Sequence, residues 1–233
     1  MKKYLFIAAL ALLSGCSKNY PVITNARAFG TISGTSFILD GGQELSIVDN
    51  QAEEEYPQGR VFMYYDIMTI KDNGQDIRVR SWSKALDKDA VKSSDYQDLS
   101  ELGDAPIKVT SGLISRKYVN LEISLTAKKE SGTKHVVNLV WDDTAADQAD
   151  TLRLYLKHDS GGESVTAGML NDGTDTSEYV AATTFACFPM SSLPEVDNGV
   201  TLPVKISFDW YEQDDSGKWT PVTQKIIGYI VKD

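Results

Sequence analysis

Apolar residues in the second half of the chain recur at every second position, the period of a strand with one buried face. The clearest run is Val119, Leu121, Ile123 and Leu125, with polar residues between. Comparable β patterns cover 135–141, 152–157, 204–211 and 219–231. A turn at 128–132 returns the chain into 135–141, and a turn at 214–217 makes the last two segments a hairpin. Strands that alternate in this way are typical of a β-sandwich.

The first half of the chain contains shorter β segments separated by glycine-rich turns. They are predicted at 28–33, 36–39, 45–49, 60–70 and 77–82. Gly41-Gly42 and Asp72-Asn73-Gly74 supply turn residues between consecutive strands. Five strands are the number that an OB barrel requires.

A polar stretch separates these two β regions. Residues 86–105 contain few β-branched residues, and a short helix is predicted around 96–102, stopped by Gly103. The predicted fold is therefore all-β, with an OB-like five-stranded barrel over 26–104 and a β-sandwich over 105–233.

The N-terminus has the features of an export signal. Basic Met1-Lys2-Lys3 precedes the uncharged apolar run 4–13, which is too short for a spanning helix of roughly 20 residues. Leu13-Ser14-Gly15-Cys16 resembles the lipobox of bacterial lipoproteins, in which the cysteine becomes the lipidated first residue. The resemblance implies a signal peptide over 1–15 and a lipidated tether over 16–25; a plain signal peptide is the alternative.

The residues after Cys16 indicate to which membrane, and to which face of it, the lipoprotein is sorted. Ser17 is not the aspartate that resembles an inner-membrane retention signal, which favours the outer membrane. The segment 17–21 also lacks the acidic cluster of surface-export signals, which favours the periplasmic face over the cell surface. Surface exposure stays open as the alternative.

Composition narrows the function classes. The 233 residues carry 33 Asp and Glu against 23 Lys and Arg, a net charge of −10, which argues against a nucleic-acid partner. The two cysteines, Cys16 and Cys187, cannot form a disulfide scaffold, and two histidines do not suggest zinc chemistry.

The order of these segments resembles the NigD-like lipoproteins of Bacteroidetes. The segments that carry the resemblance are 59–62, 76–79, the Pro106-Ile107 boundary, 118–121, 135–140 and 152–158. The resemblance implies an N-terminal OB domain, a C-terminal β-sandwich and no catalytic residues. The family name comes from an association with bacteriocin gene clusters, which implies a role in competition between cells.

No nucleophile elbow, Walker loop, dinucleotide fingerprint or zinc-protease helix occurs in the sequence. His135 and His158 are predicted to make structural hydrogen bonds, with a metal role as the alternative. The segment 171–175 is faintly similar to a calcium loop, and an acidic turn is favoured. Cys187, between Ala186 and Phe188, is predicted to be a buried hydrophobe.

The candidate ligand-binding residues are Arg78, Arg80 and Trp82, which share one strand face of the predicted barrel. That surface binds oligonucleotides or oligosaccharides in OB folds, while a solvent-facing stripe is the alternative. By strand parity Trp210 and Trp141 are predicted to point into the core, and the place of Trp219 is open.

These observations favour a non-enzymatic outer-membrane lipoprotein, an accessory or interaction module of the cell envelope. No metal or cofactor is expected. The membrane, reached through the lipid on Cys16, is the expected partner, together with an envelope protein or a glycan. The alternatives are a carbohydrate- or ligand-binding lipoprotein that uses the OB face, and a bacteriocin-associated protein.

Overall fold

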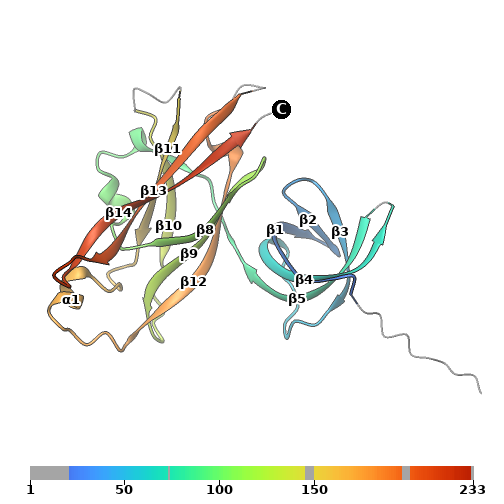
Figure 1. Cartoon of the computed structure of the whole chain (residues 1–233), viewed down its shortest axis with the longest axis horizontal. Helices are drawn as coiled ribbons and strands as arrows, with labels where there is room; N and C mark the ends of the chain where they lie inside the picture. The colour runs from blue at the N-terminus through green and yellow to red at the C-terminus, as the bar shows by residue number, and fades with distance from the viewer. Residues whose placement is uncertain (1–20, 73, 145–149, 196–199, 232–233) are drawn as a thin grey trace, which may run out of the picture.

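The computed structural model of the chain describes residues 21–72, 74–144, 150–195 and 200–231. The signal peptide and Cys16 lie outside these residues. The strands form a closed barrel and two packed sheets, which confirms the predicted all-β fold (Figure 1). No helix within the described ranges is long and apolar enough to cross a membrane.

The barrel is built from the first five strands in the order β1-β2-β3-β5-β4, and β4 closes it on β1. These strands are β1 (Ile23–Ser33), β2 (Ser36–Leu39), β3 (Glu44–Asn50), β4 (Gly59–Lys71) and β5 (Gly74–Lys84). Buried side chains from every strand fill the interior, among them Ile32, Phe37, Leu45, Met63 and Ile77. The five strands predicted from the sequence are all present.

The sandwich consists of a sheet in the order β14-β13-β11-β10-β7 and a sheet in the order β6-β12-β9-β8. Its strands are β6 (Leu86–Asp87), β7 (Val91–Lys92), β8 (Lys108–Ile114), β9 (Tyr118–Lys128), β10 (Val136–Trp141), β11 (Leu152–Asp159), β12 (Tyr179–Pro189), β13 (Thr201–Gln213) and β14 (Trp219–Val231). The predicted turn at 128–132 is present, but β9 and β10 belong to opposite sheets. The chain therefore crosses the core at this turn instead of closing a hairpin.

The predicted alternation identifies the residues that form the sandwich core. Leu152, Leu154 and Leu156 of β11 are buried, and they pack between the sheets with Leu121 and Ile123 of β9. The alternating polar residues of β11 are partly exposed. The period read from the sequence therefore identifies the buried face of these strands correctly.

The polar stretch between barrel and sandwich joins both sandwich sheets. β6 pairs with β12, and β7 pairs with β10. Two 3₁₀ turns follow, η1 (Ser93–Asp95) and η2 (Leu99–Leu102), so the predicted helix is present in a shorter form. Gly103 ends η2 with φ 88°, and a Cβ there would lie 2.4 Å from the His158 carbonyl oxygen, so no other residue fits without rearrangement.

A buried ionic network lies where the barrel meets the sandwich. Arg60 Nη1 of β4 donates to Asp40 Oδ1 at 2.5 Å, and Arg60 Nη2 donates to Asn120 Oδ1 of β9 at 2.6 Å. Asn120 Nδ2 and Ser115 Oγ donate to Asp40 Oδ2 at 2.7 and 2.9 Å. Arg60 Nη2 also lies 3.6 Å from the Sγ of Cys187 in β12. Each half of the molecule therefore supplies hydrogen-bond partners to the other, although Arg60 Nε is buried without one.

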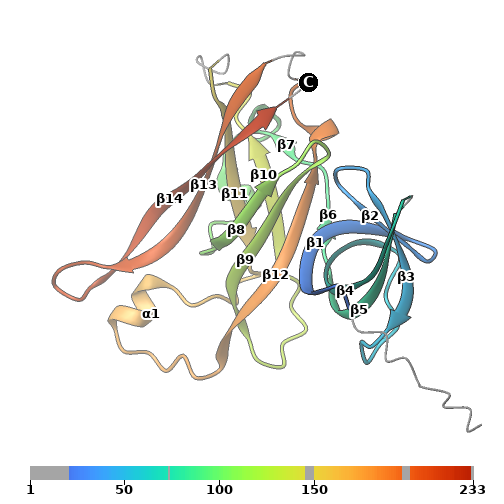
Figure 2. The same cartoon turned by 45° about the vertical axis from the view of Figure 1, so that its right-hand side comes forward.

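Aromatic rings surround this network. The ring of Phe62 from the barrel stacks on Phe185 from the sandwich, with centroids 4.3 Å apart, and Phe29 contacts both rings. The Arg60 guanidinium lies 3.8 Å from the centroid of the Tyr118 ring. Figure 2 shows the barrel directly beside β12 and β6. The apolar rings exclude water from the charges and strengthen their interaction.

Cys187 is fully buried at this contact, which agrees with the sequence prediction. Burial, only partly offset by the charge of Arg60, raises the pKa of the Cys187 thiol to about 11. The residue is therefore a neutral thiol at physiological pH and contributes packing and a weak acceptor for Arg60.

Removal of the Arg60 charge tests the network. Arg60→Met leaves the Asp40 carboxylate buried without its cation, and we expect the free energy of unfolding in urea at pH 7 to fall by about 3–5 kcal/mol. The matched control is Arg78→Met, whose partner Asp49 is 44% exposed; we expect a loss below about 1 kcal/mol there. The double variant Arg60→Met, Asp40→Leu removes both charges and regains part of the loss. Equal losses in the two single variants would contradict this account of the contact.

Candidate functional site

The two arginines predicted on the barrel face are engaged by acidic and amide side chains. Arg78 Nε donates to Asp49 Oδ2 at 2.7 Å. Arg80 Nη1 donates to Gln51 Oε1 at 2.7 Å and lies 3.7 Å from Asp66 Oδ2. Their charges are thus balanced within the barrel, and little positive potential is left for an anionic ligand.

Trp82 is half-buried and packs against the barrel core, so it is less available than the sequence suggested. Trp82 and Arg80 line an open concavity of about 480 Å³, whereas Arg78 is not among its lining residues. Exposed Glu53 and Glu54 line it as well. The structure therefore brings two of the three predicted residues together beside acidic groups, and their role in binding stays a prediction.

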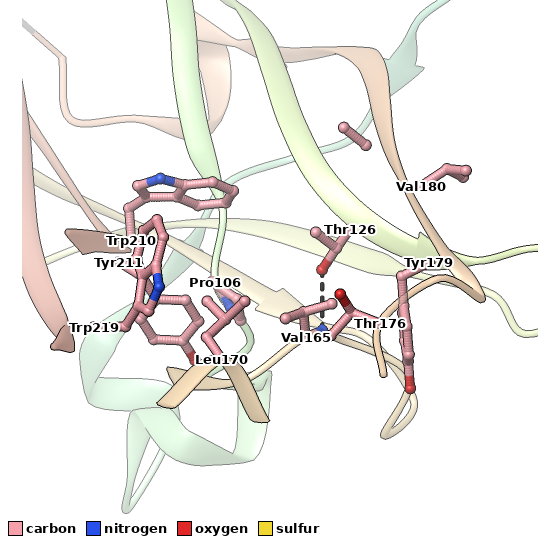
Figure 3. Close-up of a pocket in the computed structure, with 11 residues that line it drawn as sticks. Pro106, Thr126, Val165, Leu170, Thr176, Tyr179, Val180, Trp210, Tyr211 and Trp219 are labelled. Carbon is pink, nitrogen blue, oxygen red and sulfur yellow. Dashed lines mark hydrogen bonds between the residues drawn. The ribbon is translucent and has the colours of Figure 1, made fainter. Parts of the chain in front are cut away.

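A second hollow, which we call the aromatic pocket, lies at the sandwich end of the molecule and has a volume of about 300 Å³ (Figure 3). It lies among β9, β12, the β13–β14 hairpin and the loop that carries α1 (Ala167–Asn171). Its lining residues are Pro106, Thr126, Val165, Leu170, Thr176, Tyr179, Val180, Ala181, Trp210, Tyr211 and Trp219. None of these side chains is an acid or a base with a charge at neutral pH.

The aromatic rings approach the pocket from two sides. Figure 3 shows Trp210, Tyr211 and Trp219 gathered on one side, while Tyr179 lies on the other. The ring centroids of Trp210 and Tyr211 are 6.5 Å apart with planes at 28°. All four rings are only partly buried, so part of their surface faces solvent or the pocket.

Hydrogen bonds hold this wall in place. Asn171 Oδ1 accepts from the backbone N–H of Trp219 at 2.7 Å, and Asn171 Nδ2 donates to the Trp219 carbonyl at 2.8 Å. Thr166 caps α1 by accepting from the N–H of Met169. Thr126 Oγ1 accepts from the N–H of Val165 at 3.1 Å (Figure 3). The α1 loop is thus tied to β14 on one side and to β9 on the other.

The chemistry of such a pocket suits a neutral ligand with an apolar face. Ligand sites are commonly concave, mostly apolar and about 300–1,000 Å³ in volume, with a few polar groups that orient the ligand. Trp and Tyr combine a large rigid apolar surface with a polar N–H or O–H. The threonine and tyrosine hydroxyls supply donors and acceptors without charge. The arrangement fits a sugar ring better than an anion or a cation.

The sequence did not predict this pocket, and the position of Trp210 was predicted only in part. Parity predicted Trp210 in the core with Val204, Ile206 and Phe208; these three are buried, but Trp210 is only half-buried. β13 extends past the edge of the core after Phe208, so the same face of the strand lines the pocket there. Trp141 packs against the core as predicted, with Lys92 above its ring.

The segment 171–175 makes one long-range pair of hydrogen bonds and one local hydrogen bond in the structure. Asn171 binds Trp219, and Asp175 Oδ1 accepts from the N–H of Ser177, an interaction that lowers the pKa of Asp175. Within the described residues no group of three or more His, Cys, Asp or Glu side chains could hold a metal ion.

The two histidines form a hydrogen-bonded pair that reaches the pocket wall through Pro106. His158 Nδ1 donates to the carbonyl of Pro106 at 3.1 Å, since a carbonyl can only accept. His158 Nε2 must then accept, and His135 Nδ1 donates to it at 2.9 Å. Burial lowers the pKa of His158, which keeps this fully buried ring neutral. The predicted structural role is confirmed, and the pair also fixes Pro106 in the pocket wall.

A closed barrel followed by a two-sheet sandwich, with a pocket of ligand size, defines an all-β protein of two parts. The family model of the NigD-like C-terminal beta sandwich domain matches residues 90–216, more than half of the chain. The chain therefore belongs to the NigD-like family, which confirms the resemblance read from the sequence.

Three solved structures are similar over nearly the whole chain. A NigD-like immunity protein from Bacteroides caccae has a TM-score of 0.63 at 18% identity, covering 90% of this chain and 99% of that one. A candidate toxin-related protein from Parabacteroides distasonis has a TM-score of 0.57 at 17% identity, covering 86% and 92%. A candidate lipoprotein from Bacteroides fragilis has a TM-score of 0.54 at 14% identity, covering 90% and 99%. At these identities the similarity shows the fold.

Among curated proteins, no sequence matches this chain.

The lowered pKa of His158 predicts a pH-dependent stability. The unfolded chain takes up the proton first as the pH falls below about 6.5, so the free energy of unfolding decreases by up to about 1.4 kcal/mol per pH unit between pH 7 and 5.5. His158→Asn keeps a donor for Pro106 and cannot titrate, so we expect this slope to be lost. The matched control His135→Gln keeps the slope. Urea unfolding at several pH values measures both, and an unchanged slope in His158→Asn would refute the assignment.

Proposed function

We propose that the protein is a non-enzymatic, lipid-anchored binding module of the outer membrane that holds a neutral sugar ring in its aromatic pocket. The anchoring part rests on Leu13-Ser14-Gly15-Cys16, which resembles a lipobox, and on the similarity in fold to a candidate lipoprotein. Ser17 and the polar residues after it favour the outer membrane and its periplasmic face.

The chemistry of the reactive side chains supports a binding role. The Cys187 thiol is buried and has a pKa of about 11, which removes it as a nucleophile at neutral pH. His158 is buried and bonded at both ring nitrogens, so it has no ring atom left for general base catalysis. Similar solved structures carry names such as immunity protein and lipoprotein, and none of the names reported above states a catalytic activity.

The ligand proposal rests on one observation, the convergence of four aromatic side chains around an uncharged cavity of about 300 Å³. Trp210, Tyr211, Trp219 and Tyr179 offer flat apolar surfaces, against which the C–H face of a pyranose packs while its hydroxyls reach Thr126 or Thr176. The bonds of Asn171 to Trp219 hold the wall before a ligand arrives, which lowers the entropic cost of binding.

The names of two similar structures suggest a different partner, since one is an immunity protein and another a candidate toxin-related protein. A protein partner is the alternative class for the present chain as well. The uncharged pocket of limited volume favours a single ring over a protein surface, because stable protein interfaces bury about 1,200–2,000 Å².

A saccharide-binding experiment tests the ligand proposal. We expect the purified mature protein to bind neutral envelope glycans on an array, and Trp219→Ala to weaken the affinity at least tenfold, as for a central tryptophan contact. Trp219→Leu keeps an apolar side chain without the aromatic face and serves as a second variant, with circular dichroism as a check of folding. Trp82→Ala is the matched control and stays within twofold. Loss in Trp82→Ala with retention in Trp219→Ala would move the site to the barrel face, and no glycan binding at all would refute the sugar proposal.

The anchor has its own test. We expect Cys16→Ala to release the protein from the membrane fraction, because no acyl chain can then be attached. In intact cells the lipidated protein resists added protease until lysis if it faces the periplasm. Membrane association that survives Cys16→Ala would contradict the anchor, and cleavage in intact cells would place the protein on the surface.

A further inference from the structure

A further cavity, which we call the seam cavity, opens between the two sandwich sheets and has a volume of about 470 Å³. Its lining residues are Leu86, Lys88, Ile123, Leu125, Lys134, His135, Val136, Val137, Ala182, Thr184, Phe185 and Ala186. They come from β9 and β12 of one sheet and from β10 of the other, together with β6 and the residues just outside these strands.

The interior of the seam cavity is apolar. Ile123, Val137 and Ala186 are buried members of the sandwich core, and Leu125 is 5% exposed. The cavity is therefore an extension of the hydrophobic core toward solvent between β10 and β12. Exposure of apolar surface to water costs about 25 cal/mol for each Å². An apolar ligand group that fills the cavity removes this surface from water.

Few of the side chains that line the seam cavity are polar. Lys88, Lys134 and His135 are its titratable lining residues, and Thr184 is its remaining polar one. Lys88 donates to Asn138 Oδ1, and His135 is held by its bond to His158. Neither lysine forms an ion pair with a carboxylate in the described part of the chain.

The charges of the two lysines reinforce each other. Burial first, and then the charge of Lys134, lower the pKa of Lys88, so the two ammonium groups are close enough to repel. Glu163 interacts with His135 and is itself bonded to Ser131 and Thr133. Asp87 and Asp89 flank Lys88 in the chain, but neither forms an ion pair with it in the described residues. The chain as a whole has a net charge of −10, so this pair of lysines is a local exception. Positive charge beside an apolar cavity is complementary to an anion with an apolar tail.

We propose that the seam cavity binds a medium-chain fatty acid, with the alkyl chain between the sheets and the carboxylate at Lys88 and Lys134. The apolar walls supply the driving force for the chain, and charge-assisted hydrogen bonds from the lysines orient the head. This site is separate from the aromatic pocket, because the two cavities share no lining residue.

Calorimetric titration of the purified mature protein with octanoate tests the proposal. We expect saturable binding of one octanoate per chain, at least tenfold tighter than octan-1-ol or octylammonium, and no binding of acetate. These probes separate the need for the chain from the need for the negative head. Octan-1-ol binding as tightly as octanoate, or octanoate not binding, would overturn the proposal.

Variants locate the site. Lys134 is exposed, so Lys134→Gln is compatible with folding, and we expect it to weaken octanoate binding about tenfold. Ala182→Trp fills the half-exposed edge of the cavity and abolishes binding of the chain. Lys225→Gln, an exposed lysine on β14, is the matched charge control and leaves the affinity unchanged. Trp219→Ala leaves it unchanged as well, which keeps this test independent of the sugar proposal. Equal losses in Lys134→Gln and Lys225→Gln would indicate unspecific attraction and refute the site.

Discussion

The guanidinium of Arg60 requires partners from both halves of the molecule. It extends from a barrel strand with its side chain 1% exposed, and a buried charge persists only where hydrogen bonds and an opposite charge replace its hydration. Asp40 supplies the charge from the barrel, and Asn120 supplies an acceptor from the sandwich. Separation of the halves would leave the pair without Asn120 and would expose the stacked rings of Phe62 and Phe185. One orientation of barrel against sandwich therefore has the lowest free energy.

This fixed orientation gives the two ends of the molecule different tasks in our proposal. The described chain begins in the barrel with β1, whereas α1 lies at the end of the sandwich away from the barrel in both views (Figure 1, Figure 2). Leu170 of α1 lines the aromatic pocket, which therefore lies at that end as well. An anchor at Cys16 would hold the barrel near the lipid and the aromatic pocket farther out. The seam cavity lies nearer the barrel, since Phe185 lines it and also packs on Phe62.

The strands were predictable because alternation is a local property. The burial of Leu152, Leu154 and Leu156 follows from their spacing alone. The Arg60 network was not predictable, because Asp40 and Asn120 are 20 and 60 residues away and no short pattern links them. The aromatic pocket was not predictable for the same reason. It is assembled from separate segments, and strand parity does not show where the core ends. Arg78, Arg80 and Trp82 were predicted to bind a ligand because they share one strand face. The partners of the two arginines could not be identified from the sequence.

The indole N–H resonances of the four tryptophans offer the most direct test of the binding account, since each reports on a different place. Trp82 lies on the barrel, Trp141 packs near Lys92, and Trp210 and Trp219 line the aromatic pocket. A titration with a neutral oligosaccharide, followed by ¹H–¹⁵N correlation spectra, is predicted to shift the resonances of Trp210 and Trp219 and to leave the other two unchanged. A shift of Trp82 alone, or no shift at saturating saccharide, would contradict the account.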